Sequence, residues 1–266
     1  MGILALGLYL LICAGLYFNQ EAILFPARVE NQIVYEKLVK SNIEPWQFTT
    51  TDNTVLQGWY YDSHPEKPFY IYYGGNAEDV TSTFSILSET INHSLLSVNY
   101  RGYGKSAGHP SEEKLFSDAL EIFDSIQVKN KERPICLIGR SLGSGVACYV
   151  ASLRKIKSLI LITPYDSIRS VAQGKYAIIP IGLLLNHPFD SIKYSQKISV
   201  PTLFLLAQSD VIIPRENSLT LFNQWPSAKS KFIVPDTDHN NMLWDQYGRP
   251  KLISYISEFI SNSEKQ

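Results

Sequence analysis

The chain has 266 residues, with 24 lysine and arginine residues against 25 aspartate and glutamate residues, giving a formal net charge of -1. This balance excludes an electrostatic basis for nucleic-acid binding, which needs a basic surplus. A hydrophobic content of 45% with 18% charged residues excludes disorder as the main state and is sufficient for one large core. The three cysteines are too few to form a disulfide framework.

The N-terminal segment stands apart, because residues 1–18 carry no charged side chain. Ile3 to Phe18 is an unbroken run of 16 apolar or small residues. As a helix it would span roughly 24 Å, which is less than the bilayer core of about 30 Å. A helix of this length can still span a bilayer that thins locally. We therefore expect residues 1–25 to form a single-pass membrane anchor, on a side of the membrane left open, and residues 26–266 to form one folded domain. The alternatives are a buried core helix, disfavoured because no polar face interrupts the run, and a signal peptide, whose cleavage would leave a secreted or periplasmic protein.

Beyond about residue 30, short apolar runs alternate with segments of helical periodicity. Trp46–Thr51 and Val55–Tyr61 are expected to form an antiparallel pair. The later predicted strands are 69–73, 95–100, 134–139, 158–163, 202–207 and 231–234, and the predicted helices are 77–90, 111–129, 142–154, 215–225 and 250–260. This alternation predicts an α/β fold with a mostly parallel central sheet and helices on both faces.

Almost forty residues separate the predicted strands 158–163 and 202–207. A connection of that length is usually functional, and this one contains the apolar stretch Tyr176–Leu185. We expect a small cap, at about residues 167–193, over the carboxyl edge of the sheet. A helix packed on the core is the alternative.

The strongest chemical motif is Gly139-Arg140-Ser141-Leu142-Gly143, a G-x-S-x-G pattern between a predicted strand and a predicted helix. A serine at such a turn projects its hydroxyl at the sheet edge, and the flanking glycines let the backbone approach closely. The new helix directs its N-terminal N–H groups at the site. We therefore predict that Ser141 is a nucleophile.

A serine nucleophile needs a base, and the base needs an acid that orients it. Asp210 and His239 follow late predicted strands, where the carboxyl ends of parallel strands meet at one edge. They also stand in the chain order Ser, acid, His that this arrangement uses. The rival acids Asp236 and Asp238 are close neighbours of His239 in one loop, so they are poorly placed to reach the far imidazole nitrogen.

An oxyanion in the reaction needs two backbone N–H donors. We assign one to Leu142, directly after the nucleophile, and the other to Asn76, in the turn Gly74-Gly75-Asn76-Ala77 after the strand 69–73. There is no His-Glu-x-x-His or Cys-x-x-Cys motif, no P-loop and no complete dinucleotide fingerprint, so no metal or cofactor is predicted.

Together these residues resemble the α/β-hydrolase superfamily of serine hydrolases, over about residues 45–262. Three stretches are similar to the small membrane-anchored members, which include bud-emergence-type proteins and lysophospholipid and palmitoyl-thioester hydrolases: Tyr73–Glu78, Asn99–Ser106 and Gly139–Gly145. The apolar N-terminal run followed by Gln20–Pro26 also fits that group. The family often has His-Gly-Asn where this chain has Gly74-Gly75-Asn76, so the support of the oxyanion loop is expected to differ.

The resemblance implies that Ser141 is the nucleophile, Asp210 the acid and His239 the base. The predicted function is hydrolysis of carboxylic ester or thioester bonds through an acyl-enzyme, with small-molecule acyl or lipid-like substrates suggested by the apolar cap and the anchor. A serine peptidase of the same fold and a non-catalytic binding protein on that fold are the alternatives.

Overall fold

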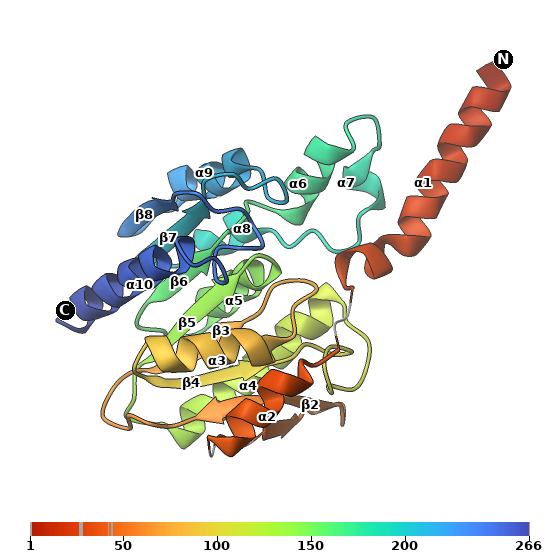
Figure 1. Cartoon of the computed structure of the whole chain (residues 1–266). Coiled ribbons are helices and arrows are strands. Elements are labelled where there is room, and N and C mark those ends of the chain that lie inside the picture. The colour runs from red at the N-terminus through yellow and green to blue at the C-terminus, as the bar shows by residue number, and fades with distance from the viewer. Residues whose placement is uncertain (1, 27–28, 42, 44, 266) are drawn as a thin grey trace.

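The computed structural model describes residues 2–26, 29–41, 43 and 45–265, in which an eight-stranded sheet lies between two layers of helices (Figure 1). The strand order is β1-β2-β4-β3-β5-β6-β7-β8. The pairs β1–β2 and β2–β4 are antiparallel, and every later pair is parallel. The strands are β1 Pro45–Thr49, β2 Val55–Tyr61, β3 Phe69–Tyr73, β4 Ser94–Val98, β5 Ile135–Arg140, β6 Leu159–Ile162, β7 Thr202–Ala207 and β8 Lys229–Val234.

Alternate residues of each central strand enter different apolar layers, because successive side chains point to opposite faces of a sheet. On β5 and β6, Leu137 and Leu161 pack into the core that contains α4, α5 and α9. Ile138 and Ile160 pack into the core that contains α2, α3 and α10. The helices are α1 Gly2–Leu24, α2 Gln32–Lys40, α3 Val80–Thr90, α4 Glu112–Lys129, α5 Leu142–Leu153, α6 Ile168–Lys175, α7 Ile181–Leu184, α8 Ser191–Ser195, α9 Arg215–Gln224 and α10 Gly248–Glu264.

The predicted fold class is confirmed. Helix α2 was not predicted, and several other differences lie at element ends. The helix expected from residue 77 begins at Val80, because the Asp79 side chain accepts a hydrogen bond from Thr81 N and caps it. The helix expected at 250–260 instead runs from Gly248 to Glu264. The helix expected at 111–129 has Ser111 as its N-cap, with the Ser111 side chain accepting from Lys114 N at 3.2 Å.

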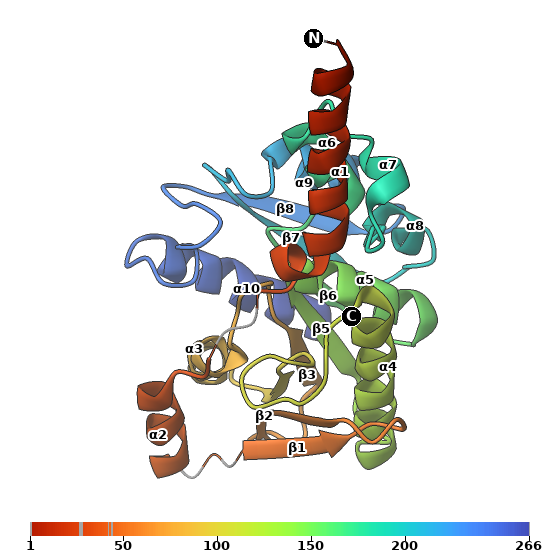
Figure 2. The same ribbon diagram turned by 90° about the vertical axis from the view of Figure 1, so that its right-hand side faces the viewer.

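Helix α1 is longer than the apolar run that predicted it, since it continues through Asn19-Gln20-Glu21 to Leu24. The Asn19 amide donates to Gly15 O of the same helix at 2.8 Å, so this polar stretch does not end it. By length and composition α1 could cross a membrane, and it contains only two buried residues, Cys13 and Gln20. Its N-terminal half projects away from the sheet and its helices (Figure 2).

Between β6 and β7 the chain forms α6, α7 and α8, and α7 lies beside α1 (Figure 2). Val171 and Phe189 from this insertion join the main core, whereas Ile179 and Ile181 form a separate small cluster with Cys13 of α1. From here on, residues 167–193 are called the cap. The cap therefore contacts both the folded domain and the N-terminal helix.

Candidate active site

Ser141 lies in the sharp turn between β5 and α5, with a positive φ of 49°. Such a conformation costs a non-glycine residue about 1–3 kcal/mol, so the surroundings must enforce it. Ser141 N donates to Ile162 O of β6 at 2.9 Å, and Ser144 N donates to Ser141 O at 2.9 Å. A side chain at Gly143 would collide with the carbonyl of Tyr73, which explains why the turn requires glycine there.

The three residues predicted for catalysis meet at the carboxyl edge of the sheet. His239 Nε2 lies 2.8 Å from Ser141 Oγ, and His239 Nδ1 lies 2.8 Å from Asp210 Oδ2. The other Asp210 oxygen accepts hydrogen bonds from Ile212 N and Ile213 N, which fixes the carboxylate. Ser141 and His239 are both buried, with exposed fractions of 9% and 6%. These contacts have the geometry that a nucleophile, a base and an orienting acid require.

The rival acids and histidines take other roles in the described residues. Asp238 accepts from Asn240 N and Asn241 N and so shapes the loop that carries His239. Asp236 sits at a positive φ of 59° in the preceding turn. His93 contacts Ile91 O and lies 2.6 Å from Glu264, at the opposite edge of the sheet.

The two predicted oxyanion donors lie on either side of Ser141. Leu142 is the first residue of α5, where N–H groups have no helical partner. Asn76 lines the same cavities as Ser141, and its side-chain amide donates to Leu24 O at the end of α1. An ideal Cβ on Gly75 would lie 3.5 Å from Ser141 Cβ, which shows how closely this turn approaches Ser141.

A buried ion pair beneath the site was not anticipated from the sequence. Arg140 Nη1 donates to Glu78 Oε2 at 2.8 Å, and Arg140 Nη2 donates to His239 O at 3.0 Å. Glu78 Oε2 also accepts from Gly75 N at 2.6 Å. Burial alone would raise the pKa of Glu78, but the charge of Arg140 and the hydrogen bonds from Thr83 and Gly75 hold that pKa below its usual value.

This ion pair joins the three segments that form the site: the turn after β3, the turn after β5 and the loop with His239. It also supports the turn after β3, because Glu78 accepts from Gly75 N. The signal available in the sequence was a charged residue, Arg140, at the end of an otherwise apolar strand, together with Glu78 three residues after Gly75.

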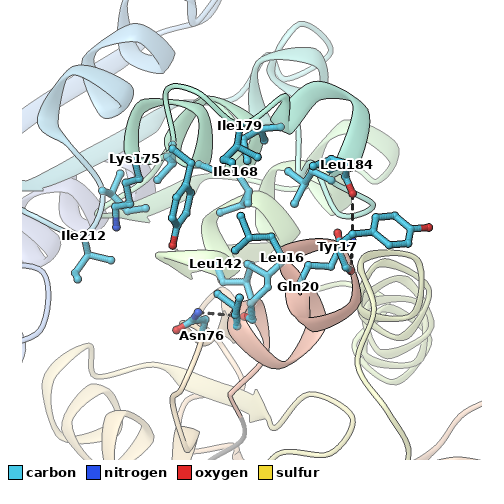
Figure 3. A pocket seen from close by; sticks show the side chains of 18 of the residues that line it. Leu16, Tyr17, Gln20, Asn76, Leu142, Ile168, Lys175, Ile179, Leu184 and Ile212 are labelled. Carbon is cyan, nitrogen blue, oxygen red and sulfur yellow. Dashed lines mark hydrogen bonds between the residues drawn. The ribbon is translucent and has the colours of Figure 1, made fainter. Parts of the chain in front are cut away.

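Two cavities meet at Ser141. One, of about 260 Å³, is lined mainly by apolar side chains of α1, the cap and the Ile212-Ile213 turn, together with Ser141. Leu142 and Asn76 lie at one end of it (Figure 3). The other, of about 520 Å³, is lined by more polar groups that include Asp79, Asn31, Ser82 and Asn240, together with His239. Within the described residues no group of three His, Cys, Asp or Glu side chains is placed to hold a metal ion.

Comparison with known proteins identifies the family. The family model described as serine aminopeptidase, S33, matches residues 89–192. An uncharacterised protein of Mycobacterium tuberculosis is 30% identical over 198 residues, which cover 72% of this chain and 70% of that protein. The chain belongs to the α/β-hydrolase family.

Other similar proteins are named for an activity. The lysophosphatidylserine lipase of Xenopus tropicalis is 30% identical over 234 residues, covering 75% of this chain but only 59% of that lipase. Among solved structures, the Pyrococcus furiosus esterase Pf2001 superposes with a TM-score of 0.71 at 18% identity, covering 90% of this chain and 98% of the esterase. Est1E from Butyrivibrio proteoclasticus has a TM-score of 0.71 at 17% identity, covering 83% of this chain and 100% of Est1E. These structural likenesses support the fold.

Proposed function

We propose that this hydrolase cleaves carboxylic esters or thioesters of acyl, lipid-like substrates through an acyl-enzyme on Ser141. The observation that carries the proposal is the pair of 2.8 Å contacts that link Ser141 Oγ, His239 and Asp210 in one buried line. The placement of that line at the end of an apolar cavity supports an acyl substrate.

The chemistry follows from the geometry. His239 Nε2 takes the proton of Ser141 Oγ as the oxygen attacks the acyl carbonyl, and Asp210 holds the imidazole and stabilises its cation. The backbone N–H groups of Leu142 and Asn76 would receive the developing oxyanion. The alcohol or thiol leaves with the proton from His239. A water molecule, activated by the same imidazole, then attacks the acyl-enzyme and releases the acid.

The two cavities suggest how a substrate is divided between them. The apolar cavity fits the acyl chain, because each buried methylene contributes about 0.8 kcal/mol when it leaves water. The polar cavity, on the side of His239, fits the leaving group, which must receive its proton from Nε2. The membrane-competent helix α1 at the wall of the apolar cavity is consistent with a substrate that resides in a bilayer.

The test uses the full chain in detergent, with a fluorophosphonate probe and esters of one chromogenic alcohol. We expect the probe to label the wild type and to leave Ser141→Ala unlabelled, and we expect Ser141→Ala to lose ester turnover. Ser144→Ala is the matched control, since Ser144 Oγ donates to Ser141 O and its loss removes one hydroxyl nearby. Equal labelling of Ser141→Ala, or faster turnover of aminoacyl amides than of esters, would refute the proposal, the latter in favour of a peptidase.

A further inference from the structure

The apolar cavity beside Ser141 has a wall that belongs to the N-terminal helix. Five residues of α1 line it, at positions 16, 17, 20, 23 and 24. Leu16, Gln20, Ile23 and Leu24 recur at helical spacing and so share one face. Figure 3 shows Leu16 across the cavity from Ile168 and Ile179 of the cap, with Leu142 close by. The helix therefore contributes directly to the space next to the nucleophile.

Polar groups fix this face of α1 to the cap. Tyr9 donates its hydroxyl hydrogen to Ile178 O at 2.9 Å, and the Gln20 amide donates to Leu184 O at 3.1 Å. Gln20 also accepts from Asn186 N at 2.7 Å. Polar side chains of a membrane helix face protein rather than lipid, because lipid tails cannot satisfy them. The same side of α1 that forms these bonds faces the cavity, so the wall is held in place.

Exposed apolar residues continue the surface from α1 onto the cap. Ile178 and Leu183 are 80% and 87% exposed, and both lie in the part of the cap that contacts α1. The opposite side of α1 is equally apolar, with Leu11 71% and Phe18 80% exposed. A bilayer that holds α1 would cover these cap residues, which places the apolar cavity at the membrane surface.

We propose that α1 is a specificity-determining part of the acyl site as well as a membrane anchor. The acyl chain of a bilayer-resident lipid lies between α1 and the cap, and Leu16 limits how much chain is accommodated. This inference rests on the proposed ester or thioester hydrolysis and adds to it the helix that selects the substrate. Leu16 acts through packing against the chain and takes no part in the chemical steps.

The experiment compares full-length variants on chromogenic esters of one alcohol with acyl chains of increasing length. Leu16→Trp fills the cavity from α1, and Leu11→Trp makes the same change on the same helix but outside the cavity. Each methylene that no longer fits should cost about fourfold in kcat/KM. We expect the ratio of long-chain to acetate-ester kcat/KM to fall by about 10- to 60-fold in Leu16→Trp relative to wild type. Leu11→Trp should follow the wild-type profile.

The variant Leu16→Ala tests the same inference without inserting a large aromatic ring. It should shift the preferred chain length upward, because it enlarges the cavity. The inference is overturned if Ser141-dependent hydrolysis persists but Leu16→Trp and Leu11→Trp share one chain-length profile, or if Leu16→Ala leaves the profile unchanged. If the wild type shows no ester hydrolysis that depends on Ser141, the proposed function itself is refuted.

Discussion

Removing the charge of Glu78 should destabilise the whole fold, because Glu78 and Arg140 form a buried pair. Their side chains are 7% and 9% exposed, and their closest atoms are 2.8 Å apart. Glu78→Gln keeps the shape but leaves the Arg140 guanidinium uncompensated and presents an amide N–H₂ to groups that already donate. Breaking one partner of a buried pair typically costs about 3–5 kcal/mol. At about 2–4 °C per kcal/mol for a domain of this size, we expect Tm to fall by about 6–20 °C.

The assay is thermal unfolding of the full chain in detergent, followed by circular dichroism. Glu89→Gln is the matched control, because Glu89 pairs with Lys37 at the same 2.8 Å distance but both side chains are at least 60% exposed. An exposed pair contributes about 0–1 kcal/mol, so this variant should melt within a few degrees of wild type. The double variant Glu78→Gln, Arg140→Met should recover part of the loss, since it buries no unpaired charge.

The effect should also depend on pH in one direction. The folded-state pKa of Glu78 is lowered, so its stabilising contribution is present above the ordinary carboxyl pKa of 4.5 and is lost as the pH falls through the folded-state value. The Tm gap between wild type and Glu78→Gln should therefore be full at pH 7 and narrow below about pH 4.5. A Glu78→Gln variant that melts with wild type at pH 7, or a gap that widens in acid, would refute this account of the pair.

Three further outcomes are expected. Asp210→Asn should lower kcat by about 10³- to 10⁴-fold with a small change in Tm, measured by ester turnover and unfolding, because the acid holds the tautomer of His239. Burial and the charge of Asp190 raise the pKa of Glu112 to about 7, although a hydrogen bond from Phe189 N opposes the shift. The wild-type Tm should therefore fall as the pH rises from 4.5 to 7. The variant Glu112→Gln should lack this pH dependence of Tm. Gly143→Ala should cost about 1–3 kcal/mol or more and impair turnover by displacing Tyr73 O, whereas Gly174→Ala, with no atom within 4 Å of the added Cβ, should cost little.

The order of the central strands and helices was predictable because the same local sequence pattern recurs along the chain. Buried parallel strands are short continuous apolar runs, and each is followed by helical periodicity. The element ends were less predictable where side-chain capping decided them. The helix predicted from residue 77 begins only at Val80, because Asp79 is its N-cap. The Asp79 carboxylate accepts hydrogen bonds from Thr81 N and Asn31 N.

The site residues were predictable to the extent that they follow strand ends. Ser141, Asp210 and His239 each come directly after or soon after a strand, and the sheet brings those ends to one edge. The pair of Glu78 and Arg140 was not predictable in this way. Its two members are 62 positions apart, and only the packing of two turns against each other brings a carboxylate under the nucleophile.

The role of α1 at the cavity also depends on tertiary contacts. By hydropathy alone, the apolar run ends at Asn19-Gln20-Glu21. Hydropathy does not take into account whether a polar side chain has a hydrogen-bond partner in the folded protein. In the folded chain Gln20 is buried and bonded to Leu184 O and Asn186 N, so the helix continues to Leu24. The 23-residue helix spans about 34 Å, enough for a bilayer core of about 30 Å only if its last turns are included. Those last turns are the ones that line the cavity beside Ser141. The proposed membrane anchor and the proposed acyl site therefore share residues, and we expect a change that weakens one to weaken the other.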